Sequence, residues 1–545
     1  MQQVLVLGGG ASGLAAALAA GNSVLAKPAE QTPLIAAQGI AILLEAGVPP
    51  GVVQLLPGQG ETVGAQLTGD DRVRGVMFTG STEVATLLQR NIASRLDAQG
   101  RPIPLIAETG GMNAMIVDSS ALTEQVVIDV LASAFDSAGQ RCSALRVLCL
   151  QDEIADHTLK MLRGAMAECR MGNPGRLTTD IGPVIDSEAK ANIERHIQTM
   201  RSKGRPVFQA VRENSEDARE WQSGTFVAPT LIELDDFAEL QKEVFGPVLH
   251  VVRYNRNQLP ELIEQINASG YGLTLGVHTR IDETIAQVTG SAHVGNLYVN
   301  RNMVGAVVGV QPFGGEGLSG TGPKAGGPLY LYRLLANRPE SALAVTLARQ
   351  DAEYPVDAQL KAALTQPLNA LREWAANRPE LQALCTQYGE LAQAGTQRLL
   401  PGPTGERNTW TLLPRERVLC IADDERDALT QLAAVLAVGS QVLWPDDALH
   451  RQLVKALPSA VSERIQLAKA ENITAQPFDA VIFHGDSDQL RALCEAVAAR
   501  DGAIVSVQGF ARGESNILLE RLYIERSLSV NTAAAGGNAS LMTIG

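Results

Sequence analysis

The sequence predicts an α/β fold built from parallel sheets, with a further α/β domain at the carboxyl end. Short runs rich in Val, Ile and Leu alternate with helical patterns, and this order implies right-handed crossovers between parallel strands. The length of 545 residues allows two or three domains, each with its own core. A hydrophobic content of 45% and a charged content of 19% suit a compact, folded chain.

The first α/β segment spans residues 1–107. We expect its strands at Val4–Leu7, Ser23–Ala26, Val52–Leu56, Val76–Thr79 and Pro104–Ala107. We expect helices between them at Leu14–Ala20, Leu34–Ala46 and Thr82–Arg95. Because strand and helix alternate throughout, the segment predicts one parallel sheet covered by helices.

Four further segments follow. Residues 108–307 form a second α/β segment with helical patterns at Leu122–Ser137 and Ile154–Arg170. The glycine-rich residues 308–339 follow, and we expect them to lead the chain back to the first α/β segment. Residues 340–415 are rich in Ala, Gln and Leu and contain several prolines, which predicts a helical linking arm rather than a strand-bearing core. Residues 416–545 predict a separate α/β domain with strands at Val418–Ile421, Gln441–Leu443, Ala480–Phe483 and Ile504–Val507.

Composition argues against several classes of protein. A net charge of −14 makes nucleic acid an unsuitable partner, since phosphates require a concentrated basic face. We find no apolar run long enough to span a membrane, and Met1–Ala20 lacks the basic start of a signal peptide. The six cysteines show no C-x-x-C spacing and no nearby histidines, which argues against a metal site or a disulfide framework and favours a reducing cytoplasm.

Two residues are candidates for covalent chemistry. Cys142 lies in the segment Phe135–Ser143, between an amphipathic helix and the apolar strand Arg146–Leu150, where a substrate can reach it. Glu108 ends an apolar strand and precedes a double glycine, at the sheet edge where open α/β folds build their sites. Taken singly, a free cysteine is more often a packing residue, and a lone glutamate more often a helix cap or a surface residue.

Two further motifs suit a dinucleotide cofactor. Lys27 ends a strand and Glu30 follows it closely; an acidic group there can accept hydrogen bonds from ribose hydroxyls and would repel a 2′-phosphate. The run Phe78–Thr82, which contains Gly80 and Ser81, passes directly from a strand into a helix, so its N–H groups and the helix dipole can receive a pyrophosphate. Either motif alone is also compatible with ordinary turn and capping chemistry.

Together and in this order, these motifs resemble the aldehyde dehydrogenase superfamily. The shared runs are Lys27–Glu30, Phe78–Ser81, Glu108–Gly111, Gly139–Cys142 and Glu243–Pro247, and the resemblance covers roughly residues 15–335. It implies a Rossmann-type cofactor domain over residues 1–107, a catalytic domain over residues 108–307, and NAD as the cofactor.

The resemblance also implies a role for each site residue. Cys142 would be the nucleophile that adds to the aldehyde, and Glu108 the base that activates water to hydrolyse the thioester, so no metal is required. The N–H of Cys142 would supply one oxyanion donor. Lys27 and Glu30 would hold the adenosine ribose, Gly80 and Ser81 the pyrophosphate region, and Glu243 with Phe245 the nicotinamide ribose.

The segment Gly295–Gly315 indicates which aldehyde is the substrate. It looks like the anchoring loop of the glutamate semialdehyde (pyrroline-5-carboxylate) dehydrogenase branch. Members of that branch hold the substrate's α-carboxylate with the N–H groups of a Gly-Ala pair, here Gly305 and Ala306, and with the serine after the nucleophile, here Ser143. Short side chains let a carboxylate approach the amides. The implied reaction is oxidation of L-glutamate γ-semialdehyde to L-glutamate in proline catabolism; the alternative is a loop that needs glycine only for its turns.

The arm and residues 416–545 look like the carboxyl end of bifunctional proline utilisation proteins. The terminal domain is similar to a degenerate aldehyde dehydrogenase fold, and since it has no loop like that of Cys142 we expect it to be non-catalytic. In that family an FAD-dependent proline dehydrogenase domain precedes the dehydrogenase, and members usually self-associate through a β-flap. The resemblance thus implies a small-molecule substrate, a proline-oxidising partner domain and a homo-oligomer.

The first 14 residues depart from the family pattern. Family members carry a long additional segment before the position of Ala15, with a Pro-Trp-Asn-Phe-Pro-like motif whose Asn side chain donates to the oxyanion. No such motif is found here, so we expect an amino-terminally truncated chain with a lower rate, since loss of one oxyanion donor typically costs about 10²–10³.

The run Gly8–Gly13 raises a rival function. It reads G-x-G-x-x-G after an apolar strand, with Glu30 about twenty residues further on, which is also the fingerprint of a flavin-binding oxidoreductase. A third alternative is a non-catalytic fragment that folds with a partner. Flavin absorbance, cysteine-dependent NADH production, or assembly with a separate amino-terminal portion would distinguish the three.

Overall fold

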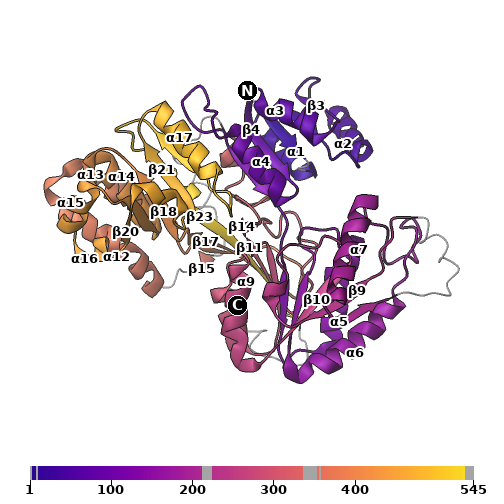
Figure 1. Ribbon diagram of the computed structural model, residues 1–545. Helices are drawn as coiled ribbons and strands as arrows, with labels where there is room; N and C mark the ends of the chain where they lie inside the picture. Colours follow the sequence, from indigo (N-terminus) through magenta and orange to yellow (C-terminus); the bar gives the residue numbers. More distant parts are fainter. Residues whose placement is uncertain (1–2, 8–9, 211–223, 336–352, 355–357, 534–545) are drawn as a thin grey trace. The chain divides into compact units, whose positions relative to one another are not determined.

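The computed structural model describes residues 3–7, 10–210, 224–335, 353–354 and 358–533 (Figure 1). The chain forms two compact units: residues 1–108, 320–399 and 410–526 make the first, and residues 109–319, 400–409 and 527–545 make the second. The sequence predicts domain boundaries at 107/108 and 307/308, whereas the units divide at 108/109 and 319/320. Gly8 and Gly9 of the glycine run, and part of the predicted arm, lie outside the described residues.

The first unit begins with a parallel sheet in the order β3-β2-β1-β4-β5. Its strands are β1 (Gln3–Leu7), β2 (Ser23–Lys27), β3 (Val53–Leu55), β4 (Val73–Thr79) and β5 (Leu105–Glu108). Its helices are α1 (Gly10–Ala19), α2 (Pro33–Glu45), α3 (Ala65–Gly69) and α4 (Thr82–Ile92). The strands and helices predicted here are confirmed, with α3 as an addition. Val24, Met77 and Ile106 are buried in one core cluster of this sheet, as parallel strands require.

A second parallel sheet of the first unit has the order β20-β19-β18-β21-β22. Its strands are β18 (Arg417–Ile421), β19 (Gln441–Pro445), β20 (Ile465–Ala468), β21 (Ala480–His484) and β22 (Val507–Phe510). Its helices are α14 (Glu425–Val438), α15 (Ala448–Ala456), α16 (Ser459–Ser462) and α17 (Ser487–Ala498). Both sheets start at a central strand and follow the same order, so the terminal domain repeats the topology of the cofactor sheet. The predicted last strand was placed three residues too early.

Helix α14 is buried around its whole circumference, from Asp427 to Val438. One side contacts β18 and another contacts the arm helices α12 (Ala358–Trp374) and α13 (Pro379–Leu391). A helix with no exposed face must be covered on all sides, which explains its run of Ala, Leu and Val. The arm helices therefore complete the core of the terminal domain.

The carboxyl ends of β18 and β21 are closed by internal hydrogen bonds. Both carboxylate oxygens of the buried Asp427 accept from the Gly513 N–H, at 3.0 and 3.1 Å. His484 Nε2 lies 2.8 Å from the Glu514 carbonyl, and Gln431 Nε2 donates to the Ile421 carbonyl and lies 2.8 Å from His484 Nδ1. Polar groups that would face a ligand at this edge of an open sheet instead bind the protein's own chain.

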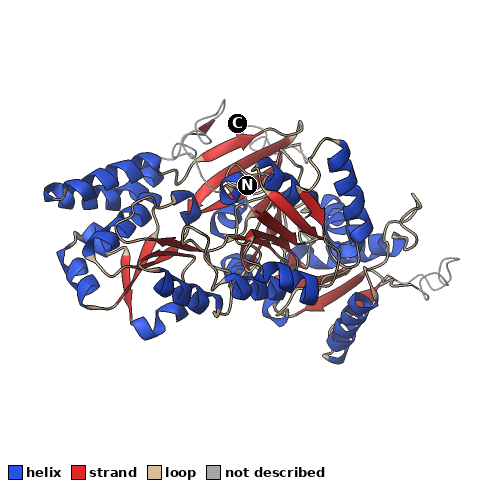
Figure 2. Cartoon of the chain, turned by 90° about the horizontal axis from the view of Figure 1, so that it is seen from above, coloured by secondary structure: helices blue, strands red, loops and turns tan. Residues whose placement is uncertain are grey.

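The second unit has a sheet in the order β13-β12-β6-β7-β10-β9-β8, parallel except for the pair β8/β9. Its strands are β6 (Ala114–Val117), β7 (Val147–Gln151), β8 (Val207–Gln209), β9 (Thr230–Leu234), β10 (Val248–Tyr254), β12 (Thr274–His278) and β13 (Asn296–Val299), with the short pair β11 (Tyr271–Gly272) and β14 (Glu316–Gly317). Its helices are α5 (Thr123–Phe135), α6 (Asp152–Glu168), α7 (Ser187–Ser202), α9 (Leu259–Ala268) and α10 (Asp282–Ser291). Figure 2 shows helices flanking the strands.

The prediction that residues 340–415 carry no strands is wrong. The segment contains β15 (Glu353–Tyr354), β16 (Gln397–Leu400) and β17 (Glu406–Pro414), which precede β23 (Tyr523–Asn531) in the strand order. Asn408 in β17 is buried, and Gln311 Nε2 donates to its Oδ1 at 3.0 Å. A distant partner thus makes a polar strand stable in the interior.

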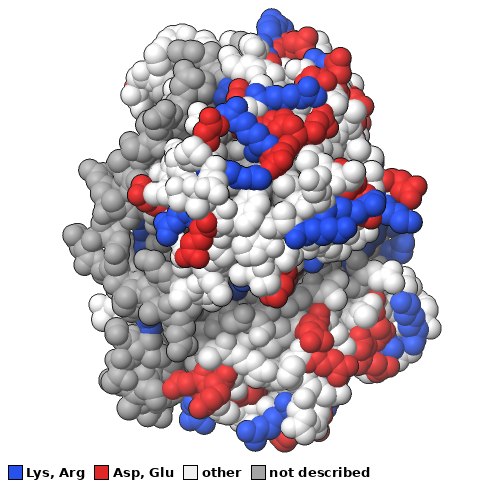
Figure 3. Space-filling model, turned by 90° about the vertical axis from the view of Figure 1, so that its left-hand side faces the viewer, with Lys and Arg blue, Asp and Glu red and all other residues white. Residues whose placement is uncertain are grey.

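The described residues contain no helix long and apolar enough to cross a membrane. On the face drawn in Figure 3, acidic and basic side chains are interspersed rather than gathered by sign. All six cysteines are free.

Candidate active site

Cys142 lies on a strained loop that follows α5. Ser137, Ala138 and Gly139 have φ values of 57°, 53° and 65°, a run of left-handed residues that non-glycine side chains rarely adopt. A Cβ on Gly139 would lie 2.2 Å from the Gly246 carbonyl oxygen, so only glycine fits where this loop meets the next. Cys142 itself is half-buried.

Of the other five cysteines, Cys169 is half-buried like Cys142 and lies outside the loop, and the remaining four are poorly suited to nucleophilic chemistry. Burial raises the pKa of Cys149 to about 12, of Cys385 to about 11 and of Cys494 to about 12, and it raises that of Cys420 as well. Because the thiolate is the reactive form, these thiols are inert at neutral pH. Position and exposure therefore favour Cys142.

Arg146, to which no sequence motif assigns a role, holds the nucleophile loop. Its side chain is fully buried, and it donates from Nη1 to the Gly139 carbonyl at 2.7 Å and from Nη2 to the Arg141 carbonyl at 3.0 Å. The same guanidinium donates to Oε1 of Glu243 from Nε at 3.1 Å and from Nη2 at 3.0 Å. It also lies 5.0 Å from the centre of the Phe245 ring. One buried cation thus joins the Cys142 loop to the predicted cofactor residues.

Electrostatics agree with this arrangement. Burial lowers the pKa of Arg146, while its attraction to Glu243 and to Cys142 opposes the shift. The attraction is reciprocal, so the guanidinium stabilises negative charge on the Cys142 sulfur. A cation beside the nucleophile is the environment expected of a reactive cysteine.

Asn113 and Ser133 support the same loop from the interior. Asn113 Nδ2 donates to the carbonyls of Cys142 and Ala144 at 2.7 and 2.8 Å. Ser133 on α5 accepts from the Leu145 N–H through its carbonyl at 2.9 Å and from the Met303 N–H through its Oγ at 3.0 Å. Ser133 therefore connects the nucleophile loop with the loop that carries Gly305. Sequence reasoning missed both residues because their partners are distant in the chain.

The predicted anchoring loop begins after β13. Gly305 is exposed with φ 77°, and Ala306 is half-buried. Among the described residues, neither of their N–H groups donates to a protein acceptor. The buried Ser143 follows the nucleophile, and its carbonyl accepts from Thr274 Oγ1 at 3.3 Å. The structure places these residues in the same unit as Cys142. Their substrate role stays a prediction.

Glu243 depends on a glycine of the Glu108–Gly111 motif. A Cβ on Gly110 would lie 1.8 Å from Glu243 Oε2, so the carboxylate occupies space that only glycine leaves open. Phe245 is 46% exposed and can present its ring to a ligand. The structure thus brings together Gly110, Glu243, Phe245 and Arg146 within the second unit.

The other cofactor candidates lie in the first unit. Lys27 at the end of β2 is buried, and its Nζ lies 2.7 Å from Glu30 Oε1. The hydrogen bond from Lys27 lowers the pKa of Glu30. Ser81 caps α4 by accepting from the Val84 N–H at 3.2 Å, and Gly80 donates to the Glu108 carbonyl at 3.1 Å.

Glu108 ends β5 beside Thr79, the last residue of β4, and beside Gly80, which follows it. It lies close enough to Tyr330 that, with burial as the larger cause, its charge raises the pKa of that phenol. Glu108 and Cys142 belong to different units, so their pairing stays a prediction. No group of three or more potential metal ligands occurs among the described residues.

Comparison with protein families gives a match to the aldehyde dehydrogenase family over residues 8–336. The chain belongs to the aldehyde dehydrogenase family. The match includes the whole Gly8–Gly13 run and gives the flavin alternative no support. The terminal domain lies outside the matched residues.

Individual relatives show which members of the aldehyde dehydrogenase family this chain is similar to. It is 99% identical over 532 residues to the bifunctional protein PutA of Escherichia coli K12, covering 98% of this chain and 40% of that protein. It is 37% identical over 318 residues to a 1-pyrroline-5-carboxylate dehydrogenase of Bacillus cereus, covering 58% of this chain and 60% of that enzyme. The chain thus spans about two fifths of the length of the PutA relatives that it matches.

Solved structures agree. A crystal structure of a bifunctional proline utilization A protein has 51% identity and a TM-score of 0.56, with 61% of this chain and 34% of that chain covered. A 1-pyrroline-5-carboxylate dehydrogenase from Thermus with bound NAD has 36% identity and a TM-score of 0.56, with 61% and 64% covered. The predicted aldehyde dehydrogenase fold is confirmed.

Proposed function

We propose that this chain carries the NAD-dependent oxidation of L-glutamate γ-semialdehyde, formed from Δ1-pyrroline-5-carboxylate, to L-glutamate. The observation that carries the proposal is the Cys142 loop held by Arg146, in a chain related to PutA proteins and to 1-pyrroline-5-carboxylate dehydrogenases. Relatives supply the substrate class, and the loop supplies a nucleophile in a suitable environment.

The residues present fit NAD. Lys27 and the ionised Glu30 would bind the adenosine ribose, Gly80 and Ser81 at the start of α4 would receive the pyrophosphate, and Glu243 with Phe245 would bind the nicotinamide ribose. When bound, NAD supplies the hydride acceptor. The cradle at Gly110 and the bond from Arg146 hold Glu243 in place beforehand.

The protein's own groups perform the remaining chemistry. The Cys142 thiolate adds to the aldehyde carbon, and the Cys142 N–H donates to the resulting oxyanion. Loss of hydride from this thiohemiacetal leaves a thioester on Cys142. Glu108 removes a proton from water, whose oxygen attacks the thioester carbonyl; glutamate leaves and Cys142 regains its thiolate. Gly305, Ala306 and Ser143 would hold the substrate's α-carboxylate.

NADH production from glutamate γ-semialdehyde tests the substrate assignment. We expect kcat/KM for pentanal, which lacks the α-carboxylate, to be at least about 10² lower, because the anchoring N–H groups would be left without an acceptor. An equal kcat/KM for the two aldehydes would contradict the anchoring role. The alternative is that the chain is a non-catalytic fragment. This alternative would be supported if the chain formed no NADH from any aldehyde and yet assembled with a separately expressed amino-terminal portion.

Glu30 should determine the preference for NAD over NADP. Replacing Glu30 with Gln is expected to reduce the ratio of kcat/KM for NAD to kcat/KM for NADP about tenfold, since the carboxylate repels the 2′-phosphate of NADP. Because Lys27 lowers the pKa of Glu30, the carboxylate stays charged, and the wild-type ratio should be constant from about pH 7.5 to about pH 9, where the 2′-phosphate is also fully ionised. Glu45→Gln, at an exposed acid at the end of α2, should leave the ratio unchanged. A pH-dependent wild-type ratio would contradict this role of Glu30.

Supply of the substrate by a proline-oxidising, FAD-dependent activity is part of the same proposal, supported by the bifunctional PutA relatives. A cytoplasmic location is supported by six free cysteines. Self-association, which the family resemblance implies, is tested by light scattering on the purified chain.

A further inference from the structure

An arginine-lined cavity lies in the first unit, away from every residue assigned above. Its volume is about 80 Å³, and residues from β4, from β22 and from the connecting segments line it. Its charged residues are Arg74, Asp97, Arg101, Arg333 and Arg521. Four cations and one acid therefore face a space about the size of one small oxyanion, or of two to three waters.

The single acid of this cavity is already neutralised. Asp97 Oδ2 accepts from Arg101 at 3.0 Å through Nε and lies 2.9 Å from its Nη2. Gln508, a buried polar residue of the wall, uses its amide in two bonds to the backbone of Leu518, at 3.1 and 3.2 Å. Among the printed contacts of these two residues, none is made to Arg74, Arg333 or Arg521.

Arg333 is the cation without compensation. Its Nε is buried and has no hydrogen-bond partner, and among the described residues its guanidinium forms no ion pair. Burial lowers the pKa of Arg333, and the charges of Arg521 and Arg415 lower it further, so its surroundings are positive. Arg333 is half-buried as a whole, with Nε on its buried side. Partial removal of an uncompensated charge from water is costly, and an anion would offset that cost.

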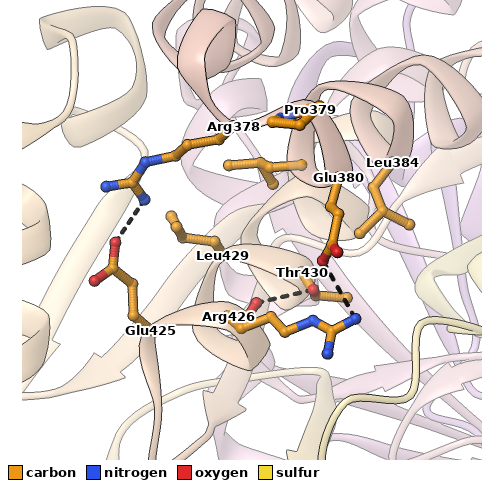
Figure 4. Close-up of a pocket in the computed structure, with 9 residues that line it drawn as sticks. Arg378, Pro379, Glu380, Leu384, Glu425, Arg426, Leu429 and Thr430 are labelled. Atoms are coloured by element: carbon orange, nitrogen blue, oxygen red, sulfur yellow. Dashed lines mark hydrogen bonds and ion pairs between the residues drawn. The ribbon is translucent and has the colours of Figure 1, made fainter.

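The larger cavity in Figure 4 provides the contrast. It has a volume of about 450 Å³ between α13 and α14, and its two arginines each have a carboxylate partner. Arg378 pairs with Glu425 at 2.5 Å, and Arg426 pairs with Glu380 at 3.4 Å. Each arginine of that cavity has a carboxylate partner, whereas Arg333 has none among the described residues.

We propose that the cavity at Arg333 is a binding site for a small tetrahedral oxyanion such as inorganic phosphate. The planar guanidinium of Arg333 would bind two of its oxygens, and Arg74 and Arg521 would add charge. Since Arg74 belongs to β4 and the opposite wall includes β22, the anion would link the cofactor sheet to the terminal domain. This site is independent of the dehydrogenase function.

Thermal unfolding of the full chain tests the proposal. At equal ionic strength, phosphate and sulfate are expected to raise Tm by a few degrees over chloride, because a ligand that binds only the folded state stabilises it. In Arg333→Met the anion-dependent increase should vanish, and Tm in chloride should equal or exceed that of the wild type, since a half-buried charge without an ion-pair partner has been removed. Arg333→Lys, which keeps the charge without the planar donor pair, should need more phosphate for the same increase.

Arg72→Gln is the matched control, because Arg72 lies near Arg74 in the chain but is exposed and paired with Asp70. It should retain the full phosphate effect.

A succinate arm distinguishes a carboxylate from a phosphate ligand; an increase with succinate alone would support the site as a carboxylate site. No anion-specific increase in the wild type, or a large fall of Tm in chloride for Arg333→Met, would overturn the proposal. If the variants fail to fold, calorimetric titration of the wild type with phosphate tests the same site, and saturable binding of about one phosphate per chain is the expected result.

Discussion

Replacing Cys142 with Ala is expected to lower NADH formation from glutamate γ-semialdehyde by at least about 10³-fold. The thioester pathway requires a sulfur nucleophile at this position, and the four buried cysteines have thiols with raised pKa values. The variant should fold, because Cys142 is half-buried and the loop is held through backbone carbonyls. Steady-state NADH absorbance and the melting temperature together measure the effect.

Cys169→Ala is the matched control for this substitution. Cys169 is also half-buried, and its thiol donates to the Ala165 carbonyl at 3.7 Å. We expect wild-type turnover from this control. Persistent NADH formation by Cys142→Ala would refute the assignment of the nucleophile while leaving the family membership intact.

Replacing Arg146 with Met is expected to reduce kcat by about 10²–10³ and to destabilise the protein by about 3–5 kcal/mol. The guanidinium holds Gly139, Arg141 and Glu243, so its loss frees the nucleophile loop and leaves a largely buried carboxylate without its partner. Folds are only marginally stable, and a loss of this size is readily measured by denaturant unfolding.

A double variant separates positioning from stability. Arg146→Met with Glu243→Gln removes both charges and should recover much of the lost stability without recovering activity. Alkylation of Cys142 by iodoacetamide gives a readout that packing alone would not change: without the cation, the pH midpoint of alkylation should rise. Arg163→Gln, at a partly exposed ion pair with Glu233, is the control. An unchanged midpoint in Arg146→Met would show that Arg146 is only structural.

Much of the fold follows from local sequence signals. The alternation of short apolar strands with helices predicts β1–β5, β18, β19 and β21, because parallel strands buried on both faces read as continuous apolar runs. Strand β20 (Ile465–Ala468) was not predicted. Strand β17 has no such signal, since Asn408 and Thr409 are polar and yet buried. Their environment depends on Gln311, nearly a hundred residues away, and local patterns do not encode such a partner.

Some residues of the candidate site can be found from the sequence, and others only from the structure. Cys142, Glu108 and Glu243 are found from motifs whose residue types suit the chemistry. Arg146 also stands in the sequence, at the start of a predicted strand, but its role appears only when Gly139 and Glu243 are brought together. A charged residue inside an otherwise apolar strand was the available signal, because such residues are buried only when they are paired.

The closed edge of the terminal sheet changes how sequence variation in that domain should be interpreted. Asp427, Gln431 and His484 have the residue types of an active site, and residue type alone would suggest that they are catalytic. Their bonds end on the protein's own chain, so a substitution there acts on the amount of folded protein rather than on turnover per molecule. Variants in this domain are therefore best ranked by abundance, and those around Cys142 by rate.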